Sequence, residues 1–206
     1  MIPMTTKDME QAVYWFLAKT GTYLCFEVMI PVHLPAVSHY DRYGNSYVYK
    51  RDTRERVDLL TYEKRGGIWR FYELKLTVSD FRSKCKKSFY GNYNYFVMPE
   101  DVYEKVKDEI PEHVGVICCV EQSYSNILKG VDCRCVKKPK KQELGVNEDE
   151  LKFNFMQSLS LKQQHLMEYK LKEMIEIERK KTSKRRTLRK KHDDKGNTET
   201  LFECDD

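Results

Sequence analysis

The chain has 206 residues, of which 33% are charged and 40% are hydrophobic, and its formal net charge is +5. This length suits one α/β domain with an appended element and excludes two full enzymes, while the hydrophobic content excludes a chain that is disordered throughout. No apolar run approaches the roughly 20 residues of a membrane span, and the first residues lack the layout of a signal peptide. We therefore expect a cytoplasmic protein with no membrane segment.

The N-terminal part of the chain predicts one helix followed by an antiparallel sheet. Residues 6–20 carry apolar side chains at helical spacing and end before Gly21. Residues 32–54 contain Pro, Gly-Asn and many charges, which predicts a loop or a mobile hairpin over a site. The turn Arg65-Gly66-Gly67 joins two strands as a hairpin. Strands are expected in the segments rich in β-branched, aromatic and aliphatic residues, at 22–31, 56–64 and 68–78.

The following segments predict a strand–helix–strand unit and then a long helix. Ser79 and Asp80 are good N-caps for a short basic helix over 79–91. A strand, an amphipathic helix and a second strand follow, and this order implies a parallel strand pair, at 93–99, 100–110 and 115–120. The remaining elements are an edge strand, a linker that begins with KKPKK, and a helix without Pro or Gly, at 131–136, 137–147 and 148–191.

Acidic residues interrupt three of the predicted strands where the pattern favours apolar side chains. Glu27, Asp58 and Glu73 each lie between apolar neighbours, and strand alternation places Lys75 on the same face as Glu73. Burying an unpaired charge is costly, so three acids with a single lysine are explained if a cation lies among them. A hard divalent ion prefers oxygen ligands of this kind.

A surface ion pair on the hairpin is the alternative explanation of Glu73 and Lys75. The Glu-x-Lys spacing recurs in the predicted C-terminal helix, where it indicates a solvated face, at 150/152, 168/170 and 178/180. Only the Glu73/Lys75 occurrence lies in a predicted strand. The acids Asp58 and Glu27 on the neighbouring strands favour a site over a surface pair.

The series Glu27, Asp58 and Glu73-Leu74-Lys75 resembles the PD-(D/E)XK nuclease superfamily. The resemblance implies a restriction-endonuclease-like α/β core of a helix, a three-stranded antiparallel meander and a strand–helix–strand finish, here with a long C-terminal helix. The stretch KLTVSDF from Lys75, the later basic residues, Tyr90 and the strands YFVMP and GVICCV are similar to the MmcB-like branch of phage and bacterial DNA repair proteins. The segment after KLTVSDF is about one helical turn shorter than in that branch, and Ser-Phe replaces its usual tryptophan.

This resemblance implies a nuclease that depends on Mg²⁺ or Mn²⁺. Asp58, Glu73 and the backbone carbonyl of Leu74 would hold the ion, and Glu27 would reach it directly or through water. Lys75 would orient or help deprotonate the attacking water and stabilise the pentavalent phosphate, while the ion neutralises developing charge. The implied catalytic residues are therefore Asp58, Glu73, Lys75 and Glu27.

DNA contacts are expected near this site and in the C-terminal helix. Near the site, basic or polar side chains would contact phosphates, while Tyr90 would stack on a base or pack in the core: Arg56, Ser79, Arg82, Lys84, Lys86, Lys87 and Tyr90. Nine of residues 179–191 are Lys or Arg, which indicates either a solvated tail or a nucleic-acid arm that includes Lys184, Arg185 and Arg186. The apolar positions of this helix predict docking on the core, a homodimer or a protein partner, through Leu151, Phe155, Leu159 and Leu166.

The seven cysteines favour reduced thiols over a secreted disulfide framework, because their number is odd and they are scattered along the chain. Cys118-Cys119 and Cys133-x-Cys135 leave a zinc site open. However, paired ligands of structural zinc sites are usually separated by about two to four residues, and neighbouring residues of a strand point to opposite faces. Buried or half-buried thiols are the alternative.

Three functions remain open from the sequence. The first is a magnesium-dependent DNA endonuclease or repair nuclease in a bacterial cell or a phage-infected host. The second is a catalytically silent nuclease-fold module that binds DNA or a partner, and the third is a structural protein whose main surface is its amphipathic tail. The expected organisation is a nuclease-like domain, a linker and a helical, basic extension, at residues 1–136, 137–147 and 148–206.

Overall fold

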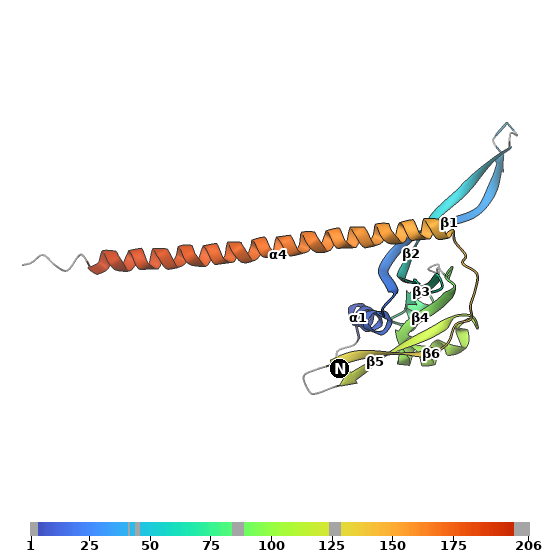
Figure 1. The fold of residues 1–206 in the computed structure, drawn as a ribbon, viewed down its shortest axis with the longest axis horizontal. Coiled ribbons are helices and arrows are strands. Elements are labelled where there is room, and N and C mark those ends of the chain that lie inside the picture. The colour runs from blue at the N-terminus through green and yellow to red at the C-terminus, as the bar shows by residue number, and fades with distance from the viewer. Residues whose placement is uncertain (1–3, 41, 44–45, 84–88, 124–128, 200–206) are drawn as a thin grey trace, which may run out of the picture. The chain divides into compact units, whose positions relative to one another are not determined.

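The computed structural model describes residues 4–40, 42–43, 46–83, 89–123 and 129–199, and the side chains of these residues outside 33–40, 47–53, 123, 129 and 183–199. The chain forms two units, Met1–Leu159 and Ser160–Asp206. The first unit contains a sheet and the helices that cover it (Figure 1). The second unit continues the long C-terminal helix, so the prediction of a mixed α/β protein with such a helix is confirmed.

A six-stranded mixed sheet forms the centre of the first unit, with its strands in chain order. The first three strands are antiparallel, the third, fourth and fifth are parallel, and the sixth is antiparallel to the fifth. The predicted parallel pair and the predicted edge strand are therefore confirmed. The strands are β1 (Thr22–Tyr40), β2 (Ser46–Glu63), β3 (Ile68–Leu74), β4 (Tyr93–Pro99), β5 (Gly115–Ser123) and β6 (Lys129–Lys137).

The helices differ from prediction mainly after the third strand. A capping box between Thr5 and Asp8 starts the first helix, because each residue bonds the backbone N–H of the other. The predicted helix over 79–91 is wrong in its bounds, since the helix there spans Val78–Phe81 and its N-cap is Thr77 in place of Ser79 or Asp80. Gly91 packs so closely on Phe71 that a Cβ would approach the ring to 2.5 Å. The helices are α1 (Thr6–Leu17), α2 (Val78–Phe81), α3 (Glu100–Val106), the 3₁₀ turn η1 (Lys107–Glu109) and α4 (Glu148–Glu199).

Residues 32–54, for which a loop or a mobile hairpin was predicted, are largely strand, because β1 and β2 continue as a long hairpin (Figure 1). Pro31 pairs in register with Arg54, and the register shifts between Leu34 and Val37, on either side of Pro35. β1 lies at the edge of the sheet, where one side of the strand needs no N–H donors. Proline is therefore compatible with this strand and does not end it.

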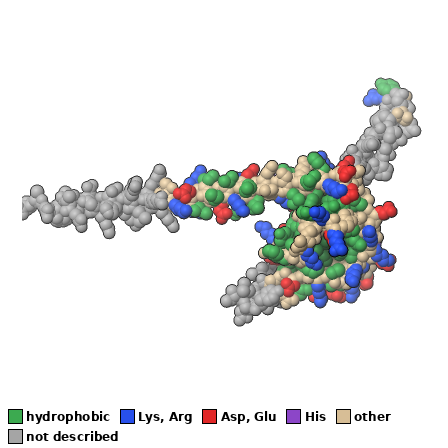
Figure 2. All heavy atoms as spheres, viewed as in Figure 1, with side chains coloured by type: hydrophobic (Ala, Val, Ile, Leu, Met, Phe, Trp, Pro, Cys, Tyr) green, Lys and Arg blue, Asp and Glu red, His purple; other side chains and the backbone are tan. Residues whose placement is uncertain are grey.

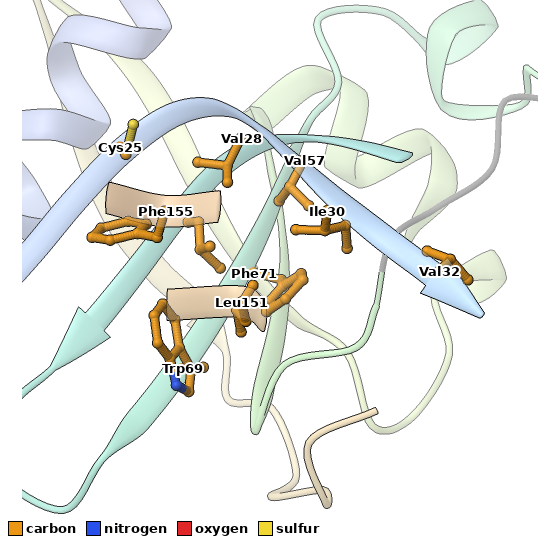
Figure 3. Close-up of a cluster of buried hydrophobic side chains, with 10 residues drawn as sticks. Cys25, Val28, Ile30, Val32, Val57, Trp69, Phe71, Leu151 and Phe155 are labelled. Carbon is orange, nitrogen blue, oxygen red and sulfur yellow. The ribbon is translucent and has the colours of Figure 1, made fainter. Parts of the chain in front are cut away.

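The start of α4 packs on the face of the sheet opposite to α1. Leu151 and Phe155 lie against Trp69 in a buried cluster (Figure 3). The Trp69 and Phe155 rings meet edge to face with centroids 5.6 Å apart, and the indole N–H of Trp69 donates to Glu148 at 3.3 Å. The expected docking of this helix through Leu151 and Phe155 is confirmed. Leu159 and Leu166, which were expected to share that role, are 37% and 53% exposed.

Beyond its first turns, α4 exposes many apolar side chains. Figure 2 shows hydrophobic side chains mixed with charged ones along the described part of this helix. These side chains include Phe153, Met156, Leu166, Met167, Tyr169, Leu171, Met174, Ile175 and Ile177. Charged residues interrupt this apolar surface throughout, and no helix among the described residues has the length and hydrophobicity needed to cross a membrane.

Candidate active site

The candidate site lies where β2 and β3 separate. Their backbone ladder runs from Glu63 and Ile68 to Leu59 and Tyr72, and then stops. One residue further, the Asp58 carboxylate accepts a hydrogen bond from the backbone N–H of Leu74 at 2.9 Å. The side chain of Asp58 thus takes the place of a main-chain acceptor and fixes its own position beside the end of β3.

Glu27 lies opposite Asp58 and has a strained backbone. The ladder between β1 and β2 pairs Phe26 with Leu59 and Val28 with Val57, but it omits Glu27 and Asp58 between them. Glu27 has a φ of 50°, the one positive value at a non-glycine position in the described chain. Such strain is uncommon and is concentrated at functional sites. The Glu27 carboxylate lies 3.5 Å from the guanidinium of Arg56, and both side chains are more than half exposed.

Glu73 and Lys75 form a buried ion pair at the end of β3. Their residues are only 4% and 6% exposed, and Lys75 Nζ lies 3.7 Å from a Glu73 oxygen. The same ammonium lies 3.8 Å from Asp80, whose carboxylate also accepts the backbone N–H of Leu76. Burial of both charges excludes the surface ion pair that was the alternative explanation of the Glu-x-Lys spacing.

A cavity of about 160 Å³ opens beside Asp58. Four carboxylates line it, namely Glu10 of α1, Glu27, Asp58 and Asp80, together with Arg56, Leu74 and Leu76. Glu73 and Lys75 do not line this cavity, and Lys75 connects Glu73 to it through Asp80. Strand alternation accounts for this separation, because Glu73 follows Trp69 and Phe71, which pack on the other face of the sheet.

The carboxylates of the cavity offer the oxygen donors that Mg²⁺ and Mn²⁺ prefer. Among the side chains that the structure describes, however, no three from His, Cys, Asp and Glu converge closely enough to hold a metal ion. The carboxylate oxygens are therefore suitable ligands for a hard divalent cation. Their positions bring them to one cavity, but no three of them are close enough together to bind one ion.

The expected DNA-contacting residues fall into three groups. Ser79 is exposed on α2, and Arg82 caps the end of this helix and forms an ion pair with Glu109. Arg56 lines the acidic cavity. Lys84, Lys86 and Lys87 lie outside the described residues, and the side chains of Lys184, Arg185 and Arg186 on α4 are likewise outside them.

Tyr90 occupies a half-buried position beside an acid that sequence reasoning did not identify. Burial, followed by the charge of Glu55 and a hydrogen bond with it, raises the pKa of the Tyr90 hydroxyl above its usual value. Glu55 is 8% exposed. Tyr90 packs against the cluster that includes Leu151, so its position supports a packing role.

Sequence reasoning also missed Glu10 and Asp80 as members of the site. Glu10 follows the buried Met9 on α1, and an acid at such a helix position gives no signal by itself. Asp80 lies five residues after Lys75, and from the sequence it was interpreted only as the N-cap of a helix. A role for its carboxylate at the site was therefore not predicted. Glu55 lay between the segment predicted as a loop or mobile hairpin and the strand predicted at 56–64, so the alternation that would have marked it as buried was not applied to it.

Comparisons with protein-family models, with curated proteins and with solved structures found no significant match for this chain.

Proposed function

We propose that this protein is a nuclease of the PD-(D/E)XK type, which hydrolyses phosphodiester bonds of DNA with Mg²⁺ or Mn²⁺ in phage or bacterial DNA processing or repair. The observation that carries the proposal is the buried pair of Glu73 and Lys75 beside the acidic cavity of Asp58. Buried charges are expensive, and strained backbone is concentrated at functional sites, so this pair and the positive φ of Glu27 at the cavity together favour a chemical role.

The order of elements supports a restriction-endonuclease-like core. A helix precedes three antiparallel strands, and a parallel strand–helix–strand unit follows, from α1 to β5. The candidate residues Glu27, Asp58 and Glu73 lie on the three antiparallel strands β1, β2 and β3, and Lys75 directly follows β3. Fold alone does not assign an activity, so the proposal depends on the residues of the site.

In this proposal Asp58, the carbonyl of Leu74 and Glu27 would hold the metal ion, with Glu10 and Asp80 as further oxygen donors at the cavity. Glu73, which was expected to be a further ligand, lies outside the cavity and would hold Lys75 in place. The ion would neutralise charge that develops on the phosphate. Lys75, which is fixed between Glu73 and Asp80, would orient the attacking water and stabilise the negative charge of the phosphate oxygens. The strained Glu27 would keep its carboxylate beside that of Asp58.

The test is cleavage of plasmid and single-stranded DNA by the full chain in magnesium. We expect Asp58→Asn and Glu73→Gln to reduce the cleavage rate by at least about 100-fold, because each removes a charge from the site. Asp108→Asn is the matched control, since Asp108 is exposed on η1 away from the cavity. Excess chelator should abolish cleavage, and calcium should bind without supporting turnover because its looser geometry misplaces the water. Cleavage that persists in chelator, or in the Asp58 variant, would contradict the assignment.

A catalytically silent module that binds DNA or a partner is the second candidate. The observation in its favour is that acids of the cavity already have partners within the chain, since Asp58 accepts from Leu74, Glu27 pairs with Arg56 and Asp80 pairs with Lys75. Such a module would bind DNA with the same affinity in the Asp58→Asn variant and would cleave neither substrate. Measuring binding and cleavage on the same preparations separates the two candidates.

A further inference from the structure

The thiols of Cys119 and Cys133 lie 3.2 Å apart on the neighbouring strands β5 and β6. The two residues are direct partners in the antiparallel register. Cα atoms of such partners are about 4.5 to 5.5 Å apart, which lies within the range of about 4.4 to 6.8 Å that a disulfide spans. A covalent bond between the two sulfurs therefore requires no large movement of the backbone.

The other described cysteines are placed differently. Cys118 belongs to the cluster under α3, on the opposite face of β5 from Cys119. Cys135 is exposed two residues beyond Cys133 and donates to the carbonyl of Lys137. Cys25 lies in the cluster around Trp69. The sequence left a zinc site at these cysteines open. Among the described residues, however, no three His, Cys, Asp or Glu side chains are placed to bind one metal ion.

The two thiols are unequal in access. Cys119 is only 1% exposed, whereas Cys133 is half-buried. The two thiols share a hydrogen bond in which either sulfur can be the donor, and this bond lowers the pKa of Cys133 and raises that of Cys119. An accessible thiol with more thiolate character next to a second thiol is the arrangement that oxidants select.

We propose that Cys133 and Cys119 are an oxidation site at which a hydroperoxide converts the two thiols into a reversible disulfide between β5 and β6. The Cys133 sulfur attacks one peroxide oxygen, the O–O bond breaks, and the second oxygen leaves with the Cys133 proton as water when the oxidant is hydrogen peroxide. Cys133 is then a sulfenic acid. Cys119 attacks its sulfur, the S–S bond forms, the S–O bond breaks, and the hydroxyl group takes the Cys119 proton to leave as a second water.

This site is independent of the proposed nuclease activity. Cys119 also lines a separate cleft of about 780 Å³ with Leu76 and Thr77, which directly follow Lys75. The disulfide would join the edge strand β6 to β5 at the border of that cleft. A thiol reductant would restore the two thiols, as is typical of cysteines that respond to redox conditions inside cells.

The test is oxidation of the fully reduced, intact chain with a small excess of hydrogen peroxide. We expect the loss of two titratable thiols per chain, and a disulfide that tandem mass spectrometry places between Cys119 and Cys133 and not at Cys118. Dithiothreitol should reverse it. Because this measurement uses the unmodified chain, it does not depend on the folding of any variant.

Two variants provide the matched comparison. Cys133→Ser should lose the disulfide, whereas Cys135→Ser, two residues along the same strand, should form it at the rate of the unmodified chain. Before peroxide is added, an alkylating agent should modify Cys133 faster than Cys119. The proposal is overturned if the disulfide joins other cysteines, if Cys133 proceeds to a sulfinic acid without a disulfide, or if no thiol is lost.

Discussion

The buried ion pair of Glu73 and Lys75 makes each charge depend on the other. We expect Lys75→Met to lower the free energy of unfolding by about 3 kcal/mol, because Glu73 then remains buried without its cation. The double variant Glu73→Gln/Lys75→Met should recover most of this loss, since neither charge remains. Urea unfolding of both variants measures the difference, with Lys105→Met as an exposed control. Equal stability of the Lys75 variant and the unmodified chain would show that the pair is not buried in solution.

Substitutions of Glu27 test whether the backbone is strained at this position beside the site. A left-handed conformation costs a residue with a Cβ roughly 1 kcal/mol, and glycine avoids this cost. We therefore expect Glu27→Gly to have a free energy of unfolding about 1 kcal/mol higher than that of Glu27→Ala. Both variants lose the pair with Arg56, so this comparison isolates the backbone. Glycine is normally the less stable choice in a strand, so the reverse order would argue against strain at this position.

The candidate residues could be found in the sequence only where a charge broke a regular pattern. Asp58, Glu73 and Lys75 stood out because alternation in a strand is strict, and the structure buries the last two. Glu10 could not be recognised, because a helix surface accepts glutamate at any exposed position. The separation of Glu73 from the cavity also escaped prediction, because the sequence does not show that Asp58 opens to the cavity beside α1 while alternation keeps Glu73 on the face of Trp69 and Phe71.

At the scale of elements, the first turns of α4 are part of the hydrophobic core. Leu151 and Phe155 are 1% and 5% exposed, so Leu151→Ala and Phe155→Ala should each lower the free energy of unfolding by about 2 to 5 kcal/mol. Leu166→Ala is the matched control on the same helix, and its effect should stay within about 0.5 kcal/mol because Leu166 is exposed. Similar losses for Leu166 and Leu151 would mean that the exposed part of the helix is covered in solution.

The bounds of helices and strands were predicted best where the local sequence preference agrees with the place of the element in the folded sheet. The strand at Tyr93–Pro99 has the predicted bounds, because an apolar run is followed directly by acids that favour a helix start. The extension of β1 was missed because proline normally ends a strand. Proline is tolerated within β1 because this strand lies at the edge of the sheet. The edge position follows from the strand order of the whole sheet and not from local sequence.

At the scale of the whole molecule, the basic part of α4 is the proposed second binding region for DNA. Truncation after Glu178 removes the basic run and leaves the cavity residues of the first unit unchanged. We expect weaker binding to duplex DNA and a salt dependence that is less steep by about 0.9 for each phosphate that the removed residues neutralise in the full chain. Truncation after Glu199 is the control, because it retains the basic run. If affinity and salt slope match those of the full chain, the run is a solubilising tail and the first unit alone binds DNA.

The prolines of β1 affect the tendency of the protein to aggregate through the edge of its sheet. An edge strand offers unpaired peptide groups to any other chain, and a long edge of this kind is a template for aggregation and fibril growth. Pro31 and Pro35 have no N–H, so neither can donate a hydrogen bond to an added strand, and the register shift beside Pro35 bends the strand locally. Imino acids at these two positions therefore disfavour the addition of a further strand at this edge, a task separate from any chemistry at the site.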